Sequence, residues 1–144
     1  SMAGLRIGYA ISNPELIKAL NDVKYSYNSY TMNRPSLVLG VESIHDDAYF
    51  REKVGQIIAT RERFVKEIAE LGFTCLPSSA NFVFATHESI PAKKIFAAAK
   101  ENNIYVRYFD KPRIDNYLRI SIGTDAEMDA FVAFLKGYVE TKQN

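Results

Sequence analysis

Residues 116–123 read Asn-Tyr-Leu-Arg-Ile-Ser-Ile-Gly, and this stretch decides the fold. From Leu118 every second residue is aliphatic and alternates with a polar one, which is the two-residue period of a strand with one buried face. Arg119 is therefore predicted to lie mid-strand on the opposite face. Thr124 and Glu127 follow at the spacing of a capping box, which predicts that a helix begins there. A guanidinium fixed in this way can bind a carboxylate or phosphate through two hydrogen bonds, and a surface ion pair with a neighbouring acid is the alternative.

The composition is that of an ordinary globular protein with one feasible core. The chain has 144 residues, 47% hydrophobic and 24% charged, with a formal net charge of +1. This near-neutral charge gives no electrostatic reason to expect nucleic acid or an anionic membrane as a partner. The single cysteine, Cys75, excludes an internal disulfide and is interpreted as a small core residue, and no Cys/His cluster suggests a metal. No apolar run approaches the roughly 20 residues that span a bilayer, so we expect a cytoplasmic protein.

The first third of the chain predicts a buried strand, a helix and a tyrosine-rich loop. The strand covers residues 7–11, and the Ser-Asn-Pro-Glu pattern of residues 12–15 starts the helix. From Lys24 the pattern changes to a polar loop that ends at Pro35. A strand this apolar is normally central in a sheet, yet no neighbouring strand is evident. We therefore expect this stretch to be disordered, swapped onto a neighbour or buried in a self-associated interface, in a chain that is part of something longer.

The rest of the chain predicts helices followed by a compact sheet, which makes the fold class α/β. Helix resumes at Ser36, is interrupted at residues 45–47, and continues to about Leu71 with a solvated face of mixed charge. Gly72 then suits a left-handed cap. Strands are expected at residues 73–76, 81–85, 104–109 and 117–123, with helices from Pro91 to about Asn102 and from Asp125 to about Lys142.

Few side chains suggest catalysis by this chain itself. His45 and His87 are isolated in the sequence and are expected to be solvated rather than catalytic. Arg6, Arg107 and Arg119 differ from them, because each lies in an expected strand or at its entry, without an acid in the same strand. Three positioned guanidiniums suggest a ligand with more than one anionic group.

Four segments match, in order, the motifs of one enzyme family. They are Ala-Gly-Leu-Arg-Ile-Gly-Tyr at residues 3–9, Ser-Ala-Asn-Phe-Val at 79–83, Ile-Tyr-Val-Arg at 104–107 and Tyr-Leu-Arg-Ile-Ser-Ile-Gly-Thr at 117–124. Together they resemble the fold-type I, class I/II aminotransferases that depend on pyridoxal 5'-phosphate, with Asn103 where the family has a glycine. The resemblance implies that residues 1–33 are the tail of the large cofactor-binding domain, with its last strand and helix. It implies that residues 34–144 are a connecting helix and the C-terminal small domain, a mixed sheet with flanking helices.

The resemblance also implies a role for each arginine. Arg6 resembles the ligand of the cofactor phosphate, Arg119 the clamp for the substrate α-carboxylate, and Arg107 a second substrate contact. The Schiff-base lysine of this family stands a short turn before the first motif, which places it before Ser1, and no lysine in the chain matches it. The chain is thus expected to be the C-terminal part of a homodimeric enzyme acting on small amino acids and keto acids. Alone, it is expected to be inactive and not to bind the cofactor.

Two alternatives remain open. Another class I/II aminotransferase, or a decarboxylase of a phosphorylated amino acid, would show the same motifs, because many contacts that select the substrate lie outside this chain. A protein of a different class, a non-catalytic α/β module whose arginines bind a small anion, would need no lysine at all.

Overall fold

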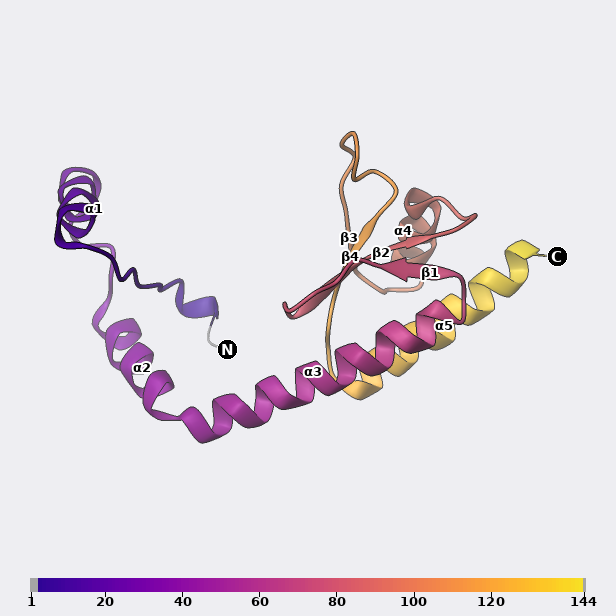
Figure 1. The fold of residues 1–144 in the computed structure, drawn as a ribbon, viewed down its shortest axis with the longest axis horizontal. Coiled ribbons are helices and arrows are strands. Elements are labelled where there is room, and N and C mark those ends of the chain that lie inside the picture. The colour runs from indigo at the N-terminus through magenta and orange to yellow at the C-terminus, as the bar shows by residue number, and fades with distance from the viewer. Residues whose placement is uncertain (1–2, 144) are drawn as a thin grey trace. The chain divides into compact units, whose positions relative to one another are not determined.

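The computed structural model describes residues 3–143 and divides the chain into two compact units, residues 1–52 and 53–144 (Figure 1). The division falls inside one continuous helix, α3 (Asp47–Ala69). These two units reflect only the contacts within this chain. The domain boundary that the family resemblance implies, after residue 33, therefore stays a prediction.

The first unit contains a short 3₁₀ helix (Ala3–Leu5) and the helices α1 (Pro14–Tyr27) and α2 (Arg34–His45). Both α-helices begin in the same way. Asn13 Oδ1 accepts a hydrogen bond from the backbone N–H of Leu16 at 2.9 Å, and Asn33 Oδ1 accepts one from Ser36 at 2.8 Å. A proline in the first turn of each helix supplies a preset backbone angle. The predicted start of α1 is confirmed, but the helix runs on into the predicted loop as far as Tyr27, where the Asn28 N–H donates to the Lys24 carbonyl at 2.9 Å.

The predicted strand at residues 7–11 is wrong. Residues 6–13 have no regular secondary structure, because no strand in the described part of the chain pairs with their backbone groups. Tyr9 and Ile11 are 82% and 88% exposed. Ile7 packs toward α2 instead, where a Cβ added to Gly40 would lie 2.5 Å from its Cδ1. The expectation that this stretch self-associates stays a prediction.

The second unit is built on a four-stranded sheet in the order β1-β2-β4-β3. All of its described strand pairs are antiparallel. The strands are β1 (Phe73–Cys75), β2 (Phe82–His87), β3 (Arg107–Tyr108) and β4 (Leu118–Ser121). β4 therefore lies inside the sheet, paired on both sides. β3 is shorter than the predicted 104–109, because Asn103 takes a positive φ of 60° and residues 104–106 do not pair with β4.

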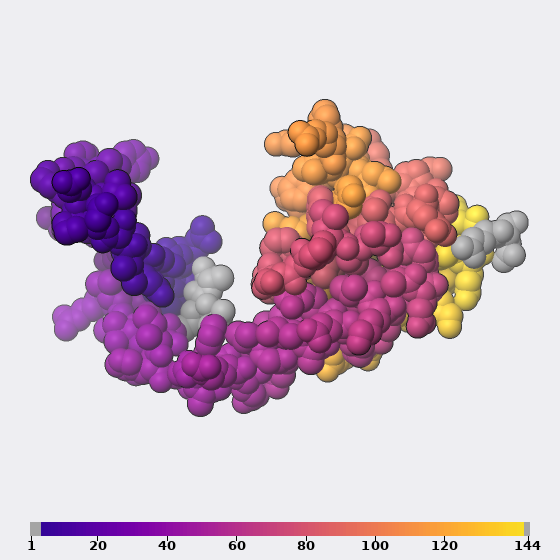
Figure 2. Space-filling model, viewed as in Figure 1, coloured from indigo at the N-terminus to yellow at the C-terminus, as the bar shows by residue number. Residues whose placement is uncertain are grey.

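Three helices cover one face of this sheet and leave the other open: α3, α4 (Ala92–Glu101) and α5 (Asp125–Gln143). Alternate residues of β2 and β4 enter the shared core, as the period of residues 116–123 predicts. The predicted α/β class is confirmed, but the described sheet is antiparallel and not the mixed sheet that the family resemblance implied. In Figure 1, α3 and α5 lie side by side, and in Figure 2 the β3–β4 loop, in orange, projects from this unit. The largest fully buried core side chains are Phe64, Ile68, Val83, Ile95, Leu118, Ile120 and Leu135.

His87 is buried at the end of β2, which contradicts the expectation that it is solvated. Its Nε2 lies 2.9 Å from the carbonyl oxygen of Leu71, and its Nδ1 accepts from the N–H groups of Ser89 at 3.1 Å and Ile90 at 3.0 Å. Because a carbonyl only accepts and an amide N–H only donates, the proton belongs on Nε2. His87 thus fastens the end of α3 to the turn before α4. Gly72, which follows Leu71, has φ +85°, as its predicted role as a left-handed helix cap requires.

The first turn of α5 contains the predicted capping box. Glu127 Oε2 accepts from the Thr124 N–H at 2.7 Å, and Thr124 Oγ1 lies 3.4 Å from the Glu127 N–H. Met128, which is 3% exposed, adds a bond of its own, because its Sδ accepts from the Gly123 N–H at 3.3 Å. These contacts fix the junction between β4 and α5.

Candidate functional site

Arg119 lies on the open face of an interior strand. Its neighbours Leu118 and Ile120 are 1% and 2% exposed on the core side, whereas the Arg119 side chain faces solvent. The residue is paired with Phe84 of β2 on one side and with Arg107 of β3 on the other. No carboxylate in the described part of the chain forms an ion pair with it. The alternative of an edge-strand arginine paired with a neighbouring acid therefore does not hold.

Arg107 stands directly opposite Arg119 across the β3–β4 pair. Like charges in opposite positions normally destabilise a sheet. Each guanidinium lies over an aromatic ring instead of beside an acid. The Arg119 guanidinium carbon is 5.3 Å from the centroid of the Phe82 ring, and that of Arg107 is 5.3 Å from the centroid of Phe109. Sequence reasoning had selected both arginines, and the structure brings these two together.

Four aromatic rings complete this surface, and sequence reasoning missed them. Phe84 stacks on Tyr117 with a centroid distance of 4.7 Å and an interplanar angle of 11°. Phe84 also meets Phe109 edge to face at 6.5 Å. We call this surface, made of Arg107, Arg119, Phe82, Phe84, Phe109 and Tyr117, the arginine–aromatic face. The sequence does carry a signal for it, because Phe82 and Phe84 alternate with core residues, but only the strand register shows that they adjoin the arginines.

Arg6 lies in the first unit, so it is described separately from the other two arginines. It has a positive φ of 57° and lines a cavity of about 480 Å³ together with residues 31–33 and Ser36. Ser36 is 5% exposed, and its hydroxyl forms no hydrogen bond to another residue of the described chain. Ser36 lines the same cavity as Arg6. A guanidinium and a free hydroxyl at one cavity suit an anion.

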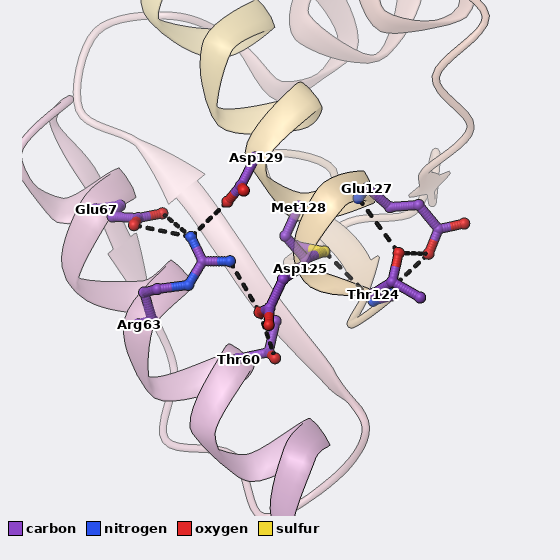
Figure 3. Close-up of polar contacts among 9 residues, drawn as sticks. Thr60, Arg63, Glu67, Thr124, Asp125, Glu127, Met128 and Asp129 are labelled. Carbon is purple, nitrogen blue, oxygen red and sulfur yellow. Dashed lines mark hydrogen bonds and ion pairs between the residues drawn. The ribbon is translucent and has the colours of Figure 1, made fainter. Parts of the chain in front are cut away.

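A second cluster of charges, around Arg63, is structural. Arg63 bonds to Asp129 at 2.6 Å and to Asp125 and Glu67 at 3.0 Å each (Figure 3). Thr60 Oγ1 donates to Asp125 at 2.8 Å, and these bonds, from Thr60 first and Arg63 next, lower the pKa of Asp125. The cluster joins α3 to α5, which corrects the interpretation of Arg63 as part of a merely solvated face. The Arg63 guanidinium is already paired with three carboxylates, so we interpret the cluster as structural and not as a ligand site.

Other candidate chemistries find little support in the described residues. No group of three His, Cys, Asp or Glu residues within residues 3–143 is placed to hold a metal ion. Burial raises the pKa of the Cys75 thiol and so disfavours the reactive thiolate. None of the described helices combines the length and the apolarity that crossing a membrane requires.

The chain matches one family of enzymes. The model of the family described as aminotransferase class I and II matches residues 1–135. The chain belongs to this family.

The relatives are more specific than the family. The histidinol-phosphate aminotransferase of Brachyspira hyodysenteriae (strain ATCC 49526 / WA1) is 47% identical over 136 residues, which cover 94% of this chain and 38% of that protein. Two crystal structures of histidinol-phosphate aminotransferases are each 26% identical and cover 97% of this chain. The one from Clostridium acetobutylicum has a TM-score of 0.86 with 43% of its chain covered. The one from Sinorhizobium meliloti, in complex with pyridoxal-5'-phosphate, has a TM-score of 0.83 with 38% covered. The chain thus spans about two fifths of the length of such relatives.

Proposed function

We propose that this chain works as part of a histidinol-phosphate aminotransferase. The reaction transfers an amino group from histidinol phosphate to 2-oxoglutarate and yields imidazole acetol phosphate and glutamate. The similarity to curated relatives supports this assignment, and one observation carries it: Arg107 and Arg119 oppose each other on an open sheet face without a carboxylate partner. The family resemblance further supports a cytoplasmic homodimer in the amino-acid biosynthesis of the cell.

The two substrates present different anions to these arginines. 2-Oxoglutarate, like the glutamate formed from it, carries a carboxylate next to the reacting carbon, whereas histidinol phosphate carries a phosphate ester and no carboxylate. Both anions offer a pair of oxygens that a planar guanidinium can bind with two parallel hydrogen bonds. We therefore assign Arg119 to the carboxylate of one substrate and the phosphate of the other. Arg107 is the second contact. Its positive charge should stabilise the doubly charged phosphate more than the singly charged carboxylate.

The cofactor of the family is pyridoxal 5'-phosphate, and the residues of the first unit fit its phosphate. Arg6 supplies a permanent charge, and Ser36 supplies a free hydroxyl at the same cavity. When bound, the cofactor supplies the electron sink for amino-group transfer. The arginines of the second unit orient the substrate, so that the bond to be broken at its Cα is held in one direction. Since the chain has no lysine that matches the family's cofactor-bearing lysine, we propose that it is inactive alone.

Substitution of Arg119 in the complete enzyme tests the proposal. A substrate anion left in a partly dry site without its partner costs roughly 2–5 kcal/mol. Arg119→Ala should therefore lower kcat/KM by roughly 30-fold to several thousand-fold. Arg119→Lys should also be poor, because an ammonium cannot make two parallel bonds, whereas Arg113→Lys in the β3–β4 loop should be neutral. Both half-reactions are followed by stopped flow, with a thermal melt alongside. If Arg119→Ala left both half-reactions within about threefold of wild type, the assignment would be wrong.

A further inference from the structure

We propose that Phe82 and Phe109 are positioning residues, which hold the guanidiniums of Arg119 and Arg107 in fixed places where each can bind an anion. The inference deepens the proposed function and rests on it for the identity of the anion. Each ring lies at 5.3 Å from its guanidinium carbon, within the range of a cation–π contact. Neither arginine has a carboxylate in the described chain that could do this instead.

The register of the strands shows what the rings accomplish. Phe82 is paired with Ser121, so the Arg119 side chain leans toward the Ser121 end of β4. Phe109 follows β3 beyond Tyr108, which is paired with Leu118, so the Arg107 side chain leans in the opposite direction. Two like charges that start from directly opposed backbone positions are thereby drawn apart. The contacts with the rings thus offset the repulsion between the two like charges and hold each guanidinium in one place.

The ring contacts leave the arginines able to bind. A cation–π contact uses the charge of the guanidinium, whereas a carboxylate or phosphate is bound by its N–H groups. No hydrogen bond within the described chain occupies those N–H groups of Arg107 or Arg119. Both side chains are therefore restricted without losing donors, which reduces the entropy that binding an anion would cost.

The Phe109 ring needs support of its own, because it lies outside the paired part of β3. Phe84 provides that support, with one edge-to-face contact to Phe109 and a stack on Tyr117. The ring beneath Arg119 is different, since Phe82 belongs to β2 itself. We therefore expect the Arg119 side to be the more rigid half of the pair.

The first experiment uses the 144-residue chain and the NMR signals of the arginine Nε–Hε groups, with inorganic phosphate as the probe. Ring currents should displace both signals, and phosphate should move both in a saturable titration. Phe82→Leu should abolish the displacement of the Arg119 signal alone and weaken phosphate binding about two- to fivefold. Phe109→Leu should do the same for Arg107, and Phe82→Tyr, which keeps a ring, should resemble wild type. Unchanged signals in the two leucine variants, or a wild-type chain that shows no saturable phosphate binding, would overturn the proposal.

The second experiment uses the complete enzyme and a double-mutant cycle. Phe82→Leu should raise KM for histidinol phosphate about two- to fivefold with kcat nearly unchanged, since the contact is made equally in the ground and transition states. In an Arg119→Lys background the same substitution should change KM by less than about 1.5-fold. An equal effect in both backgrounds would assign Phe82 a purely structural role. If the enzyme showed no aminotransferase activity at all, the proposed function would fail, and the NMR titration would still decide the role of the rings.

Discussion

Replacing His87 tests whether this buried imidazole is a structural group, as its surroundings indicate. It is 3% exposed, and its two nitrogens serve one carbonyl and two backbone N–H groups. His87→Ala leaves all three without their partner. Each unsatisfied buried group costs about 1–3 kcal/mol, and water entering the vacated space recovers part of this sum. We expect a loss of about 2–4 kcal/mol in the free energy of unfolding.

His87→Asn separates the two halves of this network. The Oδ1 of asparagine occupies nearly the position of the imidazole Nδ1, so it can still accept from the N–H groups of Ser89 and Ile90. Only the bond to the Leu71 carbonyl is lost, and we expect a cost of about 1–2 kcal/mol. The order of stability should therefore be wild type, then His87→Asn, then His87→Ala. His45→Ala, at the exposed end of α2, serves as the matched control and should stay within about 0.5 kcal/mol of wild type.

Urea unfolding of the 144-residue chain, followed by circular dichroism, measures these differences. For a domain of about 60–100 residues, each kcal/mol corresponds to about 4–8 °C in Tm, so a thermal melt should show the same order. A loss below about 1 kcal/mol for His87→Ala would refute the structural role. Equal losses for the alanine and asparagine variants would refute the acceptor role assigned to Nδ1.

The capping box and its neighbour predict a loss of stability at low pH. Hydrogen bonds from Thr124 lower the pKa of Glu127, and hydrogen bonds from Thr60 and then Arg63 lower the pKa of Asp125. A lowered carboxyl pKa stabilises the folded state above the ordinary carboxyl pKa of about 4, and this stabilisation is lost as the pH falls through the lowered value. The difference in urea midpoint between wild type and Glu127→Gln should shrink below about pH 4, and a constant difference would contradict this. Gly72→Ala should cost about 1–2 kcal/mol in a melt, because φ is +85° and the new Cβ would lie 3.0 Å from a Glu88 oxygen, whereas Gly55→Ala, with open space around it, should be neutral or stabilising. The 144-residue chain mixed with pyridoxal phosphate should give no stoichiometric lysine adduct after borohydride reduction and mass spectrometry; a full adduct at one lysine would disprove its predicted inactivity toward the cofactor.

Local patterns were enough to predict the elements that bury one face. The alternation around Arg119 and the capping box at Thr124 depend on neighbours in sequence, and the structure confirms both. The strand predicted at residues 7–11 is wrong because a strand needs a partner, and apolar content alone does not supply one. The prediction that His87 is solvated is wrong for a related reason, since its burial depends on a strand register and on α3.

The arginine–aromatic face shows the same limit in the candidate site. Sequence motifs identified Arg107 and Arg119 one at a time. That the two are directly opposed, and that Phe82 and Phe109 lie beneath them, follows from pairing between strands far apart in sequence. Such pairing is set by the whole core, so no short window of sequence could have contained it.

The Met128 sulfur accepts a hydrogen bond from the Gly123 N–H, so the oxidation of this sulfur can report how often the start of α5 opens. Oxidation turns a thioether into a polar sulfoxide, which cannot keep the same packing at a position that is only 3% exposed. Peroxide should therefore oxidise Met128 faster when the first turn of α5 separates from the sheet. The oxidation rate of this one sulfur then reports how often the junction behind Arg119 breaks, and the resulting sulfoxide would keep it from closing again.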